Sequence, residues 1–220
     1  MIQKPPKPKK CKQCANVFTP ARPLQSCCTI QCAIELGKVN NAKKEKKKAA
    51  VERKVWEMTN EKMAFFEKPL ETEINAISRL IDAGCNCISC APNTPIKKIF
   101  GGHFRSVGSN KTIRYNLHNI HSQCFSCNGR KGGAPIEYED GLKRVYGDEY
   151  AEYVKYALIN EFKELHWTRQ QLVDWTKEAR KIRAELEKEE KIYTPKQRME
   201  LRTKVNDRLK IYVHCPAQST

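Results

Sequence analysis

No run of about 18 consecutive apolar residues occurs in this sequence, and no hydrophobic segment follows its basic N-terminus. These two absences argue against a membrane-spanning helix and against a secretory signal peptide. Hydrophobic residues make up only 40% of the 220 positions, and the mean hydropathy is -0.70. A single large apolar core is not expected, and the sequence predicts a soluble, cytoplasmic protein built from small modules.

Acidic residues are also scarce: 25 Asp and Glu stand against 41 Lys and Arg, which leaves a net charge of +16 at pH 7. This excess predicts a polyanionic partner, and nucleic acid is the leading candidate. An anionic membrane would attract the same charge, but the missing apolar segment argues against a membrane partner. Aromatic residues are few, at 8%, and fall mainly on helical stripes, which disfavours an RNA-binding zinc protein that stacks bases.

Eleven cysteines stand out against this composition. Without a signal peptide we expect a reducing compartment, where Cys-x-x-Cys pairs bind metal more often than they form disulfides. Eight of the cysteines form two sets of four, and each set can hold one Zn²⁺ ion tetrahedrally. The two sets are Cys11, Cys14, Cys28 and Cys32, and Cys87, Cys90, Cys124 and Cys127.

Two alternatives stay open for the zinc ligands. Cys27 competes with Cys28, which we prefer because the three-residue gap to Cys32 suits a ligand pair on a turn entering a helix. His118 or His121 can replace a cysteine, since mixed sites are common, although four cysteines already complete the tetrahedron. The cysteines outside the two sets receive no role.

The predicted fold class is α+β and mostly helical, with a small zinc-stapled ββα-metal core, HNH-like or treble-clef-like, flanked by helices. Residues 33–66 contain no proline and one glycine, which predicts a long helix that Pro69 interrupts; Gly84 ends the shorter helix after it. Thr194 and Pro195 cap and start a last helix whose role the pattern does not indicate. The predicted segments are a basic arm (1–10), an N-terminal zinc knuckle (11–32), a basic helical linker (33–68), a nuclease core (69–147), a helical hairpin (148–190) and a basic C-terminal helix or tail (191–220).

The linker helix carries a one-sided charge. Residues 38–54 hold eight basic and two acidic side chains, too unbalanced for a helix held by internal ion pairs. It is either a solvated linker or a strut that contacts phosphates. The second interpretation predicts DNA contacts from Lys43, Lys44, Lys46, Lys47 and Lys48.

Residues for phosphodiester hydrolysis gather between the second pair of zinc motifs. The reaction needs a base for water, a metal ion for the developing charge and a group that holds the base. His103, after two glycines, is the candidate general base, and Asn119 can orient its ring. Asn128 offers a hard oxygen to Mg²⁺ or Mn²⁺, with His121 as a second ligand. Each residue alone would be an ordinary surface or turn residue, but the surrounding zinc motifs favour the catalytic interpretation.

Three basic residues in the same region are candidates for DNA contacts. Lys131 follows the last zinc motif and is expected to contact phosphate. Arg105 and Arg114 contact either the DNA backbone or only solvent.

Several motifs together resemble the NinG/Rap family of lambdoid phages. The resemblance covers about the first 185 residues, and its middle part is the most specific. The motifs are Lys9-Lys10-Cys11, Cys87-Ile-Ser-Cys90, Gly102-His103-Phe104-Arg105, Arg114-Tyr115-Asn116, Asn119-Ile-His121 and Gln123-Cys124-x-x-Cys127-Asn128.

The resemblance implies a phage recombination endonuclease that acts in the bacterial host on branched DNA, such as Holliday junctions and D-loops, with a divalent metal. The zinc-bracketed site is also similar to junction resolvases of the endonuclease VII type, where an aspartate beside the base and the asparagine after the last cysteine hold Mg²⁺. The asparagine corresponds to Asn128, but Gly102 occupies the aspartate position. The metal must then be held differently, with His121 or His103 itself as substitutes.

A second function class stays open: a non-catalytic, zinc-containing accessory protein that binds or anneals DNA during recombination. Gly102 in place of an aspartate favours it. A two-fold symmetric four-way junction suits a homodimer, with helices in 33–66 or 148–190 as the interface. Other phage or host recombination proteins are further expected partners.

Overall fold

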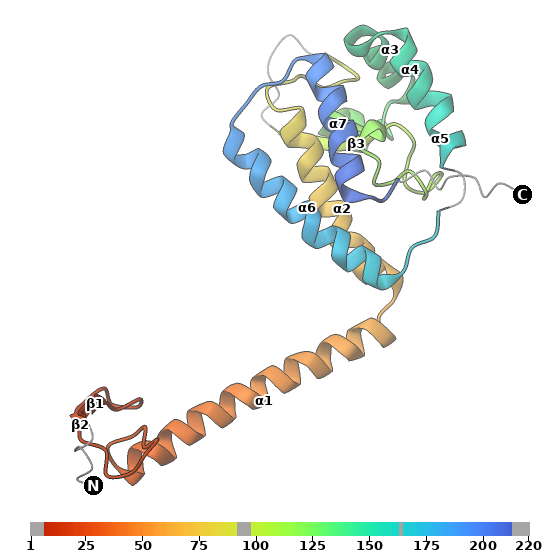
Figure 1. Cartoon of the computed structure of the whole chain (residues 1–220). Helices are drawn as coiled ribbons and strands as arrows, with labels where there is room; N and C mark the ends of the chain where they lie inside the picture. Colours follow the sequence, from red (N-terminus) through yellow and green to blue (C-terminus); the bar gives the residue numbers. More distant parts are fainter. Residues whose placement is uncertain (1–6, 92–97, 163–164, 213–220) are drawn as a thin grey trace, which may run out of the picture. The chain divides into compact units, whose positions relative to one another are not determined.

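The computed structural model describes residues 7–91, 98–162 and 165–212, and divides the chain into two compact units, 1–61 and 62–220 (Figure 1). Most described residues are helical, and the strands form two small two-stranded sheets. The mostly helical α+β prediction is therefore confirmed. No helix among the described residues is long and apolar enough to cross a membrane.

The first unit contains a short hairpin and one long helix. Strand β1 (Lys9–Lys10) pairs antiparallel with β2 (Val17–Phe18). The two lysines therefore belong to the zinc knuckle and not to the predicted basic arm, whose residues 1–6 lie outside the described residues. Helix α1 (Ile30–Asn60) begins after Thr29, whose side chain accepts a hydrogen bond from the Cys32 amide, and none of its residues is buried.

The helix boundary predicted at Pro69 is wrong. Helix α1 ends at Asn60, and α2 (Met63–Ile81) runs through Pro69. The proline removes one hydrogen bond, to the Phe65 carbonyl four residues earlier. An apolar stripe that begins before the proline outweighs this loss, because its members are buried at helical spacing: Phe66, Leu70, Ile74, Ile77 and Ile81.

The second unit is built around one β-hairpin and the helices that cover it. Strand β3 (Ile99–His103) pairs antiparallel with β4 (Ile120–Cys124), in the register Gly102 with His121 and His103 with Ile120. Short helices η1 (Leu117–Asn119) and η2 (Ser126–Arg130) flank β4. The following helices are α3 (Pro135–Tyr146), α4 (Asp148–Glu152), η3 (Tyr153–Ala157) and α5 (Leu158–Glu161).

The last two helices both pack into this unit. Helix α6 (Arg169–Glu189) starts with a capping box between Thr168 and Gln171 and lies along α2 (Figure 1). Its main packing partner is therefore α2, and not another helix of the hairpin predicted for 148–190. Helix α7 (Pro195–Leu209) has the predicted Thr194 cap and Pro195 start, and the structure places part of it in the core. It contacts η1, α6 and α2, and buries Arg198, Arg202, Val205, Asn206 and Leu209.

A buried ion pair joins α7 to the end of α2. Arg202 is fully buried, and its Nη2 lies 2.7 and 2.8 Å from the two carboxylate oxygens of Asp82. Its Nε donates to the carbonyl of Leu117, and the amide of Ser122 donates to Asp82. Burial lowers the pKa of Arg202, but Asp82 more than offsets this effect and the pKa is raised. Arg202 therefore stays charged, and its contacts tie α2, η1, β4 and α7 together.

Candidate active site and zinc centres

Each predicted set of four cysteines comes together in space. In each set the sulfur atoms lie within 4.8 Å of one another. Tetrahedral Zn²⁺ with bonds of about 2.3 Å places its sulfur ligands about 3.8 Å apart. The observed Sγ to Sγ distances include 3.5 Å for Cys14 and Cys28 and 3.8 Å for Cys90 and Cys124. Both clusters therefore fit a zinc ion.

The structure decides between the alternative zinc ligands. Cys28 joins the first cluster, as preferred, while Cys27 is buried outside it. Both clusters consist of cysteines, so neither His118 nor His121 acts as a zinc ligand. In the second cluster, Cys87 and Cys90 lie next to two cysteines from the hairpin region. Cys124 is at the end of β4, and Cys127 is in the turn formed by η2. The metal would hold this turn against the hairpin.

His103 has a defined protonation state at the end of β3. Its Nε2 lies 2.9 Å from the carbonyl oxygen of Arg114. A carbonyl only accepts hydrogen bonds, so Nε2 carries the proton and Nδ1 presents a lone pair. Within the described residues no hydrogen bond reaches Nδ1. Burial lowers the pKa of His103, and the Arg114 carbonyl only partly offsets this effect. The ring is thus neutral at pH 7 with a free acceptor nitrogen, as a general base requires.

Asn119 holds the loop after His103 and does not touch the ring. Its Oδ1 accepts from the amide of Arg105 at 2.8 Å, and its Nδ2 donates to the Arg105 carbonyl at 3.1 Å. Its own carbonyl accepts from the Phe104 amide. The prediction that Asn119 orients His103 therefore changes: the Arg114 carbonyl orients the ring, and Asn119 acts indirectly by fixing the loop between them.

Gly102 is required by its neighbour Gln123. A Cβ at position 102 would lie 2.0 Å from Oε1 of Gln123. Gln123 is fully buried, and its Nε2 donates to the Ser89 hydroxyl and to the Gly133 carbonyl, both at 2.7 Å. The glutamine thus fills the space beside Gly102. An aspartate at this position would have to displace it.

His121 lies in the core, apart from His103. It pairs with Gly102 in the hairpin, so its side chain is on the opposite face from that of His103. It is 1% exposed, with Nδ1 3.1 Å from the hydroxyl of Tyr138 and Nε2 3.3 Å from that of Tyr150. With both ring nitrogens occupied, His121 is not placed to bind a catalytic metal. Its predicted role is corrected to a structural one.

His118 and His121 predict acid sensitivity. Burial lowers the pKa of His118 to about 3 and the pKa of His121 well below 6.5. The unfolded chain therefore binds more protons below pH 6.5, and stability is lost as the pH falls from about 6.5 towards 3. For His118 this amounts to about 2 kcal/mol between pH 7 and pH 5.

Denaturant unfolding of the zinc-loaded protein at both pH values measures this loss, with bound zinc determined in parallel. His118→Gln should reduce the difference between pH 7 and pH 5 by about 2 kcal/mol. An equal difference in the variant and the wild type would contradict the assignment.

Asn128 lies in η2, directly after Cys127, and is half-buried. Among the described residues, the side chain of Asn128 makes no hydrogen bond, and no hydrogen bond joins Asn128 to His103. Apart from the two cysteine clusters, the described residues contain no group of three or more His, Cys, Asp or Glu side chains placed to hold a metal. The donors around His103 thus do not fit a preassembled Mg²⁺ or Mn²⁺ site.

The predicted DNA-contacting arginines serve the fold. Arg114 is 9% exposed, and its guanidinium contacts Glu67 at 3.0 Å and Glu71 at 2.7 Å on α2. Arg105 donates to the Lys155 carbonyl at 2.8 Å. Local sequence patterns do not predict the contacts with Glu67 and Glu71, because these residues lie more than forty positions before Arg114.

Exposed lysines remain available for a polyanion. Lys131 is exposed, and its Nζ lies 3.7 Å from Glu137, a weak surface contact. The five predicted linker lysines lie on α1 and are all exposed, and only Lys48 has an ion-pair contact, at 3.9 Å, among the described residues.

Comparison with known proteins identifies the family. The family model described as "Bacteriophage Lambda NinG protein" matches residues 3–190. The chain belongs to the NinG family. This match includes both cysteine clusters, His103 and the basic helix α1, and it ends just before α7.

Curated NinG relatives span most of the chain. It is similar to protein ninG of Escherichia phage lambda, with 26% identity over 172 residues, 70% of this chain and 83% of the relative. Protein ninG of Salmonella phage P22 is 25% identical over 194 residues, 80% of this chain and 89% of the relative. No solved structure matches this NinG-family chain.

Proposed function

We propose that this NinG-family protein is a phage recombination endonuclease that hydrolyses phosphodiester bonds in branched DNA, such as Holliday junctions and D-loops. One observation carries the proposal: His103 is held as a neutral base with its Nδ1 lone pair free, beside a hairpin that a zinc cluster fits. The proposal includes an HNH-like fold for this zinc-bracketed core, which is also similar to the core of endonuclease VII.

The chemistry assigned to the chain is proton transfer. Nδ1 of His103 takes a proton from water, whose oxygen bonds to phosphorus while the bond to the leaving oxygen breaks. Asn119 and the Arg114 carbonyl keep the ring in this orientation. A bound Mg²⁺ or Mn²⁺ ion would neutralise charge on the phosphate. The proposal includes this ion in the assay but assigns it no ligand set, since Asn128 alone does not make a site.

The test is cleavage of a labelled four-way junction and a matched linear duplex by zinc-loaded protein with Mg²⁺ or Mn²⁺. We expect the wild type to cut the junction preferentially and His103→Ala to lose at least 100-fold in rate, in line with the contribution of a general base. The rate should rise with pH through a midpoint below 6.5, because burial lowers the pKa of His103.

The matched control is His166→Ala, because His166 is an exposed histidine elsewhere in the same unit. It should cleave like the wild type, and all proteins should bind the junction equally. Tight junction binding without metal-dependent cutting by the wild type would reject the endonuclease. That result would favour the second candidate, a zinc-containing DNA-binding or annealing accessory protein, which the filled space beside Gly102 supports.

Helix α1 is assigned to phosphate contacts. It buries no residue, so its lysines are not needed for packing. Replacing Lys43, Lys44, Lys46, Lys47 and Lys48 with glutamine should reduce the magnitude of the slope of log affinity against log salt by up to about 4.5, since each phosphate contact contributes about 0.9. Binding titrations at several salt concentrations measure the slope.

A control variant carries the same charge change on exposed lysines near the C-terminus: Lys188, Lys191, Lys196, Lys204 and Lys210. Its slope should change less. An unchanged slope in the α1 variant would leave that helix as a solvated linker.

A further inference from the structure

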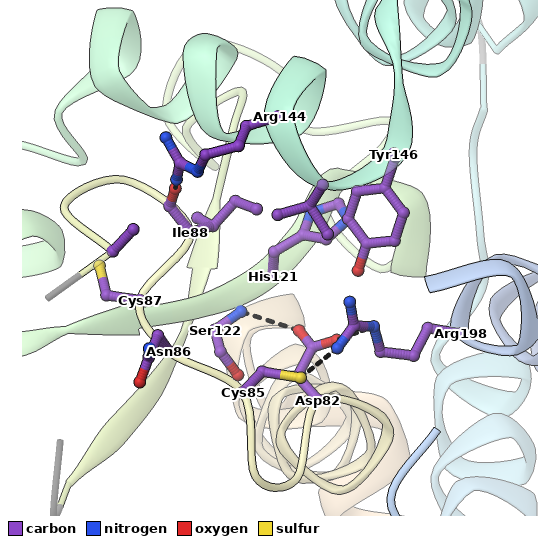
Figure 2. A pocket seen from close by; sticks show the side chains of 12 residues that line it. Asp82, Cys85, Asn86, Cys87, Ile88, His121, Ser122, Arg144, Tyr146 and Arg198 are labelled. Atoms are coloured by element: carbon purple, nitrogen blue, oxygen red, sulfur yellow. Dashed lines mark hydrogen bonds and ion pairs between the residues drawn. The ribbon is translucent and has the colours of Figure 1, made fainter. Parts of the chain in front are cut away.

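A cavity of about 290 Å³ opens in the second unit, and His103 is not among the residues that line it (Figure 2). It lies between the end of α2, the loop that follows, β4, α3 and α7. On β4 the cavity is lined by His121 and Ser122, which pair with Gly102 and Gly101 of β3. The lining includes Asp82, Cys85, Ser122, Arg144, Tyr146 and Arg198.

Two buried polar atoms on residues that line this cavity make no hydrogen bond. Arg198 is 7% exposed and Ser122 is 2% exposed. Neither Nε of Arg198 nor Oγ of Ser122 makes a hydrogen bond to any described residue. Leaving such a group unpaired costs about 1–3 kcal/mol. Both atoms can donate a hydrogen bond to a ligand.

The guanidinium of Arg198 has two neutral neighbours and one distant carboxylate. One guanidinium nitrogen contacts the sulfur of Cys85, as Figure 2 shows, and the group lies 5.3 Å from the ring centre of Tyr146. The nearest carboxylate oxygen, on Asp82, is 3.9 Å from Nε. The aromatic ring and the thiol fix the position of the arginine, and the carboxylate nearest to it is paired more closely with Arg202.

The lining of the cavity contains two arginines, Arg144 and Arg198, and one aspartate, Asp82. Asp82 is committed to Arg202 and to the Ser122 amide. Arg144 lies exposed at the rim and donates to the Ile88 carbonyl. Two lining arginines against one aspartate leave one positive charge among these side chains. A buried charge of this kind is stabilised by an anion.

We propose that this cavity binds a phosphate group. A phosphate offers several acceptor oxygens, which match the Ser122 hydroxyl and the forked donors of Arg198 and Arg144. The volume is far above the roughly 10–15 Å³ that one water molecule needs, so the cavity admits the group with part of a substituent. The phosphate is either inorganic or the terminal phosphate of a DNA strand. This site does not depend on the endonuclease proposal.

The first experiment titrates inorganic phosphate into full-length, zinc-loaded protein at constant ionic strength and follows the melting temperature. A saturable rise is expected for the wild type. Ser122→Ala should melt like the wild type without phosphate, because its hydroxyl has no partner, but bind phosphate at least threefold more weakly. Arg198→Gln should weaken binding at least tenfold, and Arg144→Gln, at the exposed rim, tests the same charge without a buried substitution.

The control is Arg130→Gln, an exposed arginine outside the cavity lining, which should respond like the wild type. No saturable rise in the wild type, or the same rise in the wild type and all cavity variants, would overturn the site.

A second arm compares short DNA strands with a 5′-phosphate and with a 5′-hydroxyl. Tighter binding of the phosphorylated strand that Ser122→Ala removes identifies a strand end as the source. Equal binding of both strands, with saturable inorganic phosphate binding, identifies free phosphate. Both results support the phosphate site and neither requires cleavage, so failure of the endonuclease assay leaves this test independent.

Discussion

Replacing Cys90 with serine will release one of two zinc ions and abolish the cooperative unfolding transition of residues 62–220. The second cluster joins the segment at Cys87 to the end of β4 and to the turn at Cys127. The only sheet among the described residues of this unit has two strands of five residues, which is marginal by itself. A structural zinc contributes on the order of 10 kcal/mol, similar to the total stability of a domain.

Zinc per chain and thermal unfolding measure the effect. Wild type should bind two zinc ions, and a strong chelator should remove both and abolish the same transition. Cys27→Ser is the control for a buried cysteine outside both clusters and should keep both ions. Cys14→Ser should lose one ion but keep the transition of 62–220, because the two units are compact separately. Retention of two ions by Cys90→Ser would contradict the cluster.

Arg202→Met will destabilise the protein by about 3–5 kcal/mol, because it leaves the Asp82 carboxylate buried without its partner. Asp82 is 5% exposed, so water does not replace the arginine. Denaturant unfolding of zinc-loaded protein measures the loss. Adding Asp82→Asn to Arg202→Met should recover part of it, because the uncompensated charge is then removed.

Arg208→Met is the matched control on the same helix. Arg208 pairs with Glu178 and Glu185 at the surface, where ion pairs contribute little, so the loss should be much smaller. Similar losses for both arginine variants would show that the Asp82 pair has no special role.

Local spacing explains which predictions held. The Cys-x-x-Cys pairs and the three-residue gap before Cys32 indicate ligand geometry within a few residues, and the clusters formed as expected. The predicted Thr194 cap depends only on a backbone donor three residues away. The helix boundary predicted at Pro69 was wrong because proline disfavours a helix only locally. Packing of the apolar stripe from Phe66 to Ile81 keeps the helix continuous.

In the candidate site as well, local sequence indicates candidate residues, but tertiary contacts decide their surroundings. The sequence indicates His103 as a base, but its tautomer depends on the Arg114 carbonyl, which the loop fixed by Asn119 brings back to the ring. The sequence equally permits His121 as a ligand. Only the pairing of β3 with β4, which sends His121 into the tyrosine core, separates the two histidines.

The sequence by itself determined the two cysteine clusters, the helical character, the basic surface and the resemblance to the NinG family, because each rests on composition or on residues close along the chain. Only the tertiary structure decided that α7 is a core helix, that Arg202 pairs with Asp82 and that Arg114 is neutralised by α2. These contacts join residues 43 to 120 positions apart, and the free energy that selects them comes from burial, which no local pattern records.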